Sequence, residues 1–117
     1  MSIIQELSFG EFSLSLGVTD LQRSLVFYET LGFEVIKENK DQGWLILKRK
    51  ELKLGLFNFF KTGPSGMTFH TDNVDFIYQN LKNSGLNFKE TPEEDNKEHL
   101  TILDPDGNWV LFDKLQK

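Results

Sequence analysis

The chain has 117 residues, near the commonest length of a single domain, and this leaves little room for a second independent core. Its hydrophobic fraction of 38%, with 11 Phe and 2 Trp, excludes an intrinsically disordered chain. The formal net charge of -5 opposes nucleic-acid binding, because the average field repels phosphate groups, and the absence of cysteine excludes disulfides, thiolate metal sites and a cysteine nucleophile.

The sequence contains no recognisable targeting or membrane signal. Residues 1–10 carry Glu6 and no basic residue before an apolar run, unlike a signal peptide, and no run of apolar residues is long enough to span a bilayer. The basic run Lys48-Arg49-Lys50 lies between two apolar strand-like stretches, and we interpret it as a hairpin turn. We therefore expect a cytoplasmic protein whose partners include neither nucleic acid nor a membrane.

The first half of the chain predicts a strand, a helix and three further strands. Apolar residues alternate with Ser and Gly over 12–18, the period-two pattern of a strand with two different faces. Thr19 or Asp20 then offers a side-chain oxygen as a helix N-cap. An apolar stripe at helical spacing continues to Leu31, and Gly32 is the residue expected to end the helix. The strands expected after it are Phe33 to Lys37, Trp44 to Lys48 and Leu52 to Phe60.

The second half predicts the same order of elements. A strand from Met67 to Thr71 precedes a cap at Asp72 or Asn73, and the helix runs to Ser84 before Gly85. The strands expected after it are Asn87 to Glu90, His99 to Leu103 and Trp109 to Leu115. Between the last two, Asp104 to Asn108 has the composition of a tight turn, and the acidic run Glu93 to Glu98 is interpreted as a surface loop.

The two halves form an internal repeat. Asp20 corresponds to Asn73 and Gly32 to Gly85, and both pairs are 53 positions apart. The sequence therefore predicts an α+β protein made of two tandem βαβββ modules in one domain, residues 1–117. Module one covers about residues 8–61, a Gly- and Pro-containing linker covers 62–66, and module two covers about 67–117.

Three stretches resemble the vicinal oxygen chelate superfamily, which includes glyoxalases, bleomycin-resistance proteins and extradiol dioxygenases. They are residues 16–28 (LGVTDLQRSLVFY), 31–33 (LGF) and 103–112 (LDPDGNWVLF). The resemblance implies that the two modules form a curled mixed sheet around a cleft, and that the chain is a homodimer whose clefts are shaped by modules of both chains. It is a poor guide to activity, because one scaffold carries lyases, isomerases, oxygenases and binding proteins.

The resemblance also indicates where a metal would be held. Metal-binding members carry His, Gln or Glu at inward-facing strand positions, and those positions correspond here to Ser13, Gly55, Gly66 and Leu111. None of these side chains is an imidazole, carboxylate or thiolate, the donors that divalent transition metals require. We therefore expect neither a metal nor another cofactor.

Strand alternation predicts which side chains line the cleft. If the apolar residues of each strand face the helices, the intervening residues face the concave side. The predicted ligand-binding residues are Ser13, Ser15, Phe57, Phe59, Thr68, His70, Trp109, Leu111 and Asp113. Such a lining, aromatic and aliphatic with few polar groups, is typical of a site for a small and partly apolar molecule.

Several residues allow two interpretations. His70 is either a general base or a partly buried histidine in a hydrogen bond, and a site for iron made of His70, His99 and Asp113 is a further alternative. Trp44, Trp109 and the Phe residues at 57, 59 and 60 either contact a ligand or cover the core or a dimer interface.

The function predicted from these features is metal-independent binding of a small organic molecule, as in bleomycin-resistance proteins. The alternatives are a glyoxalase-type lyase or isomerase that uses His70 or an unpredicted divalent metal, and a protein-interaction module that uses the concave sheet. Whether the protein is an enzyme stays open from the sequence.

Overall fold

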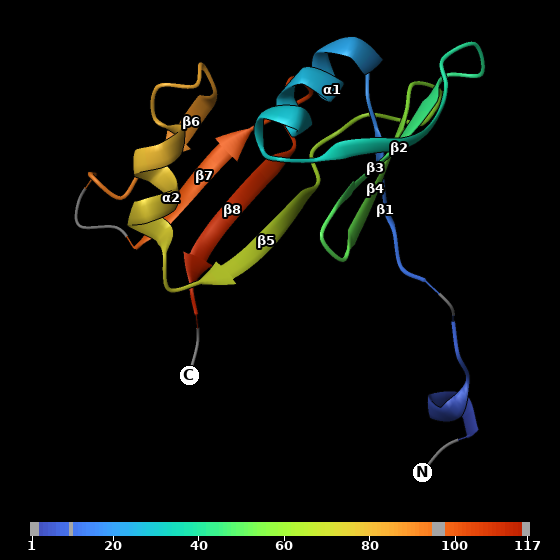
Figure 1. Ribbon diagram of the computed structural model, residues 1–117, viewed down its shortest axis with the longest axis horizontal. Coiled ribbons are helices and arrows are strands. Elements are labelled where there is room, and N and C mark those ends of the chain that lie inside the picture. The colour runs from blue at the N-terminus through green and yellow to red at the C-terminus, as the bar shows by residue number, and fades with distance from the viewer. Residues whose placement is uncertain (1–2, 10, 95–97, 116–117) are drawn as a thin grey trace.

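A computed structural model describes residues 3–9, 11–94 and 98–115. After a short 3₁₀ helix, Ile3–Glu6, the chain follows the order βαβββ twice (Figure 1). The first module comprises β1 (Leu14–Gly17), α1 (Leu21–Thr30), β2 (Glu34–Asn39), β3 (Trp44–Arg49) and β4 (Leu52–Phe57). The second comprises β5 (Gly66–Thr71), α2 (Val74–Leu81), β6 (Asn87–Glu90), β7 (His99–Leu103) and β8 (Trp109–Lys114).

Each module forms its own four-stranded mixed sheet. The strand orders are β1-β4-β3-β2 and β5-β8-β7-β6, so that the first strand of each module lies at one edge of its sheet. That strand pairs in parallel with the last strand of its module, and the other neighbours are antiparallel. The predicted α+β class and the two-module organisation are therefore confirmed.

Both helices lie where the sequence predicts them, but each ends earlier than predicted. Asp20 caps α1, since its Oδ1 accepts hydrogen bonds from the backbone N–H groups of Gln22 and Arg23 at 3.0 and 3.1 Å. Asn73 is at the N-cap of α2 but makes no side-chain cap hydrogen bond. The helix ends at Leu81 rather than Ser84, and the φ of +82° at Gly85 follows three residues after the helix C-cap position.

Strand β4 is shorter than predicted, because it ends at Phe57 and residues 58–60 form a turn. The central part of the acidic run, residues 95–97, lies outside the described residues. Lys48 and Arg49 end β3, and Lys50 takes the left-handed conformation, with φ +52°, in the hairpin turn that the sequence predicts.

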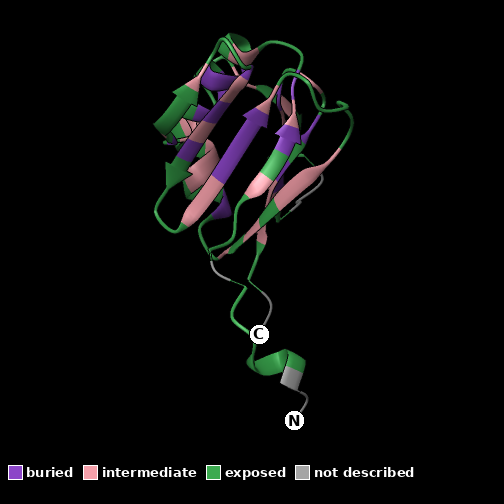
Figure 2. Ribbon diagram, turned by 90° about the vertical axis from the view of Figure 1, so that its right-hand side faces the viewer, coloured by how far each residue is buried: buried purple, intermediate pink, exposed green. Residues whose placement is uncertain are grey.

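One hydrophobic core joins the two modules. It contains Leu45, Leu47, Leu54 and Leu56 from the first sheet and Leu100, Ile102 and Val110 from the second, each 0 or 1% exposed. Figure 2 shows the buried residues along the central strands. Burial of one such side chain stabilises the fold by about 1.5 to 3 kcal/mol.

A buried polar contact holds α1 of module one against module two. The hydroxyl of Tyr28 donates a hydrogen bond to Asp104 Oδ2 at 2.8 Å, and both residues are buried. Asp104 also accepts hydrogen bonds from Asn108 N at 2.8 Å and Asn108 Nδ2 at 2.9 Å, which close the predicted turn. Burial, together with the neighbouring Asp104 carboxylate, raises the pKa of Tyr28 far above its ordinary value.

Candidate ligand-binding face

The faces of the two sheets that point away from the core carry most of the predicted site residues. Residues directly opposite in a ladder share a face, and Ser15 pairs with Gly55, Thr68 with Leu111, and His70 with Asp113. Phe57 and Trp109 alternate with the buried Leu56 and Val110 and therefore lie on the same faces. We call these two surfaces together the concave face.

Two predicted site residues lie outside the strands. Ser13 precedes β1, and Phe59 is in the turn after β4, where its side chain is 60% exposed. Period-two alternation therefore does not fix the direction of either side chain. Phe59 nevertheless belongs to an aromatic cluster with Phe57 and Phe60, whose ring centroids are 4.4 to 5.7 Å apart.

Aromatic rings cover two glycines of the concave face, Gly66 and Gly55. A Cβ built on Gly66 would collide with the indole of Trp109, and one built on Gly55 would lie 2.6 Å from Phe57 Cε2. The rings therefore occupy the space that a side chain at Gly66 or Gly55 would fill. A larger residue at either position would displace the ring, so each glycine is required for the aromatic surface beside it.

A polar row crosses the module-two part of the concave face. Asp113 on β8 is directly opposite His70 on one side and His99 on the other. His99 Nε2 lies 3.3 Å from Glu90 Oε2, and Thr101 Oγ1 donates to Glu90 Oε1 at 3.2 Å. Among the described residues, no group of three or more His, Cys, Asp or Glu is arranged to hold a metal ion.

From the sequence, the role of Trp44 stayed open between a ligand contact and a core position, and Ile46 and Thr101 were not assigned to the concave face. Trp44 is opposite Phe57, Ile46 is opposite Gly55, and Thr101 is opposite Leu111. His99, considered from the sequence only as part of an alternative iron site, is partly buried, and its Nε2 lies 3.3 Å from Glu90 Oε2. The signal that could have found these residues is the same alternation, applied to β3 and β7 as well as to the first and last strand of each module.

Within the described residues, the two parts of this face do not lie opposite one another. Figure 1 shows α1 between the two sheets and α2 in front of the second, so that the helix-free faces of the sheets point in different directions. An apolar cavity of about 380 Å³ lies instead on the helix side, between α2, the end of α1 and Arg49. Of the predicted site residues, only His70 lines it.

The family model of the Glyoxalase/Bleomycin resistance protein/Dioxygenase superfamily matches residues 12–112, most of the chain. The chain belongs to this superfamily. The resemblance drawn from residues 16–28, 31–33 and 103–112 is thereby confirmed. No helix in the described residues has the length and hydrophobicity that a membrane crossing requires.

Several solved structures share the fold. An antibiotic-binding protein from Streptomyces sp. CB03234 is 26% identical, with a TM-score of 0.74 over 94% of this chain and 99% of its own. A bleomycin resistance determinant encoded on the transposon Tn5 is 21% identical, with a TM-score of 0.66 over 92% and 98%. A lactoylglutathione lyase from Agrobacterium tumefaciens is 18% identical, with a TM-score of 0.70 over 92% and 94%. No curated protein matches by sequence.

Proposed function

We propose that this superfamily member binds a small, partly apolar organic molecule on its concave face without a metal, in clefts that two copies of the chain form together. The observation that carries the proposal is the aromatic surface made by Trp109 over Gly66 and by Phe57 over Gly55. Aromatic rings with a few convergent polar groups are the usual lining of a small-molecule site.

The same two glycines support independence from a metal. They stand where metal-binding members carry a donor side chain, and a glycine has no donor. A donor introduced by mutation would first have to displace Trp109 or Phe57. The remaining corresponding positions, Ser13 and Leu111, do not supply the imidazole or carboxylate that a divalent ion needs.

Three features support a homodimer. The edge strands β1 and β5 each present an unpaired backbone edge within the described chain. Trp109 and Phe60 on or beside the concave face are 39% and 44% exposed. Figure 1 shows the N-terminal segment leaving the rest of the molecule, and its Phe9 and Phe12 are 86% and 72% exposed. Apolar groups exposed in this way are expected to be covered by another surface.

In the proposed dimer, module one of one chain faces module two of the other. Strand β1 then lies beside the partner's β5. The module-one part of the concave face of one chain and the module-two part of the partner's concave face line one cleft together. The antibiotic-binding relative supports a ligand of the size and character of an antibiotic. The cysteine-free composition favours a reducing compartment, and we propose the cytoplasm.

The first test is a thermal-shift titration with metal-free bleomycin in the presence of EDTA. A ligand at 100 times its Kd stabilises the folded state by about 2.7 kcal/mol, which raises the Tm of a domain of this size by about 10 °C. We expect Trp109→Ala to abolish the shift. A shift that appears only when zinc, nickel, manganese or iron is added would contradict metal independence.

A second experiment tests the shared cleft through subunit mixing. Phe57→Ala damages module one and Trp109→Ala damages module two, and neither homodimer is expected to bind. In a mixed dimer, one cleft carries both defects and the other carries none, so random mixing restores about one cleft in four. If each cleft were built within one chain, mixing would restore no binding.

One observation favours a catalytic alternative. His70 and Asp113 face one another across the ladder, an arrangement in which a carboxylate can orient an imidazole. Turnover of the hemithioacetal of methylglyoxal and glutathione, lost in His70→Ala and retained in His99→Ala, would establish a glyoxalase-type activity through His70. The absence of turnover by the wild type leaves binding as the function.

A further inference from the structure

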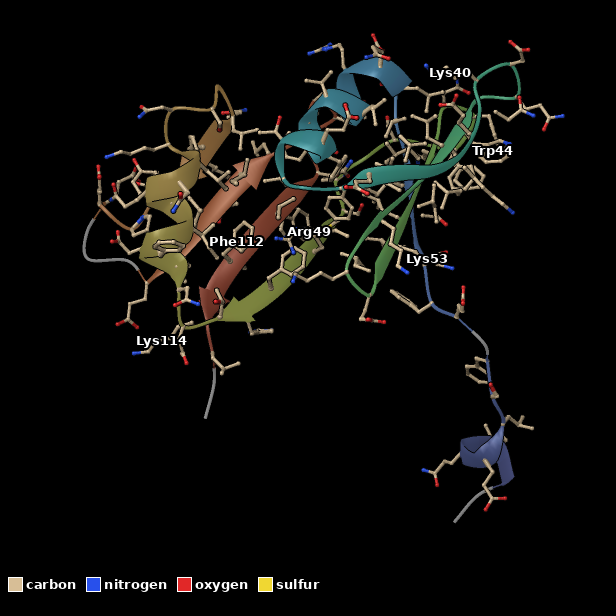
Figure 3. All side chains as sticks on the ribbon, viewed as in Figure 1. Lys40, Trp44, Arg49, Lys53, Phe112 and Lys114 are labelled. Atoms are coloured by element: carbon tan, nitrogen blue, oxygen red, sulfur yellow. The ribbon has the colours of Figure 1, made fainter. Side chains whose placement is uncertain are left out.

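The apolar cavity of about 380 Å³ on the helix side of the module-two sheet has features of a second binding site. Its floor is the ring pair Phe69 and Phe112, which stack with centroids 5.4 Å apart at 17°. Leu31, Ile77 and Leu81 close its sides, and Phe76 on its border is 70% exposed. Figure 3 shows Arg49 at the end of β3 on the side of the cavity opposite α2, near Phe112.

The cavity exists because the two modules of the repeat contact each other unequally. On one side, Tyr28 of α1 packs against the turn between β7 and β8 and is bonded to Asp104. The repeat offset of 53 residues places Leu81 of α2 at the position of Tyr28. Leu81 has a shorter side chain with no hydroxyl, and space remains between α2 and the turn between β3 and β4.

Arg49 gives this apolar space one positive charge. Its Nε donates to the carbonyl oxygen of Leu31 at 2.9 Å, which fixes the guanidinium beside Gly32. In the described part of the chain, no other hydrogen bond or ion pair engages its remaining N–H donors. None of the described lining residues is acidic, although the chain as a whole carries a net charge of -5.

We propose that this cavity binds an amphipathic anion, namely a carboxylate attached to an aromatic or alkyl body. The body packs on Phe69 and Phe112 between α2 and the end of α1. The carboxylate takes the free N–H groups of Arg49, whose planar fork matches its geometry. The site is separate from most of the concave face, because Phe69 and Phe112 are on the opposite side of β5 and β8 from Thr68 and Leu111, and His70 is the one predicted site residue that borders both.

The test uses 4-phenylbutyrate and its uncharged amide as a matched pair of probes in isothermal titration. We expect wild-type protein to bind the carboxylate at least about tenfold more tightly than the amide, the contribution of one charge-assisted hydrogen bond. Arg49→Gln removes this preference and leaves amide binding unchanged. Arg49→Lys restores part of it, whereas Lys48→Gln, on the same strand but the opposite face, changes nothing.

The position of the bound probe is read from NMR chemical shifts. We expect the largest changes at Phe69, Ile77, Leu81 and Phe112, and small ones at Trp109 and Leu111. The proposal is overturned if wild-type protein binds neither probe at millimolar concentration, if Arg49→Gln keeps the carboxylate preference, or if the shifts concentrate on the concave face. Circular dichroism of each variant verifies that its fold is retained.

Discussion

We expect removal of the Tyr28 hydroxyl, which joins the two modules through Asp104, to cause a pH-dependent loss of stability. Tyr28→Phe deletes the donor that lies 2.8 Å from Asp104 Oδ2 in a fully buried position. Asp104 keeps its bonds to Asn108, so the carboxylate is not left without a partner. A hydrogen bond to a charged group contributes about 1.5 to 3 kcal/mol, and we expect Tyr28→Phe to lower the free energy of unfolding by about 2 kcal/mol at pH 7.

The pH dependence follows from the raised pKa of Tyr28 in the folded protein. In the unfolded chain this tyrosine loses its proton near pH 10, while the folded form keeps it. The stabilisation is therefore complete below pH 10, and above that value it falls by about 1.4 kcal/mol per pH unit. The wild type and Tyr28→Phe should become equally stable between about pH 11 and pH 12.

Urea unfolding of the two proteins from pH 7 to pH 11.5 measures this difference. The matched control is Tyr78→Phe, the other tyrosine of the chain, whose ring contacts Phe88 and whose hydroxyl has no hydrogen bond among the described residues. It should change stability by less than about 0.5 kcal/mol. A Tyr28→Phe variant as stable as the wild type at pH 7, or a difference that does not change with pH, would show that the bond from Tyr28 to Asp104 does not stabilise the fold in this way.

Three further predictions concern the caps, the aromatic surface and the N-terminal segment. Asp20→Ala should lower the free energy of unfolding, measured in urea, by about 1 kcal/mol. Asn73→Ala should lower it much less, because the Asn73 side chain makes no cap hydrogen bond. Equal losses in the two variants would contradict this difference. Gly66→Ala should displace the Trp109 indole, shift its fluorescence emission and abolish the bleomycin-induced thermal shift, and unchanged fluorescence would show that the ring does not depend on the glycine. Deletion of residues 2–9 should weaken the proposed dimer in analytical ultracentrifugation, and an unchanged dissociation constant would remove this segment from the interface.

The sequence predicted those parts of the fold that depend on local chemistry. The alternation around Leu54, Leu56 and Val110 separated the buried face of each sheet from the other face. Asp20 and Gly32 bracketed α1, and the repeat located the second module. Helix and strand ends were less accurate, because the last turn of α2 and the turn at Phe59 depend on packing rather than on propensity.

The parts of the site that could not be predicted depend on contacts between distant segments. The ring of Trp109 over Gly66 requires the parallel register of β5 and β8, across 43 positions of sequence. The pairing of His99 with Glu90 requires the shifted register between β6 and β7. The cavity beside Arg49 results from the packing of two modules, which periodicity within one strand or helix does not encode.

Cysteine crosslinking between chains tests the shared cleft most directly. The chain has no cysteine, so Ser15→Cys and Thr68→Cys introduce single reactive sites at equivalent positions of the repeat, on the edge strands β1 and β5. Chains carrying one variant each, with tags of different size, are mixed and treated with a short bis-maleimide. We expect a crosslinked heterodimer of the two variants and none when Gln22→Cys, on α1, replaces Ser15→Cys. A double variant carries Ser15→Cys and Thr68→Cys in one chain. Crosslinks within this single chain, with none between chains, would contradict a cleft shared by two copies.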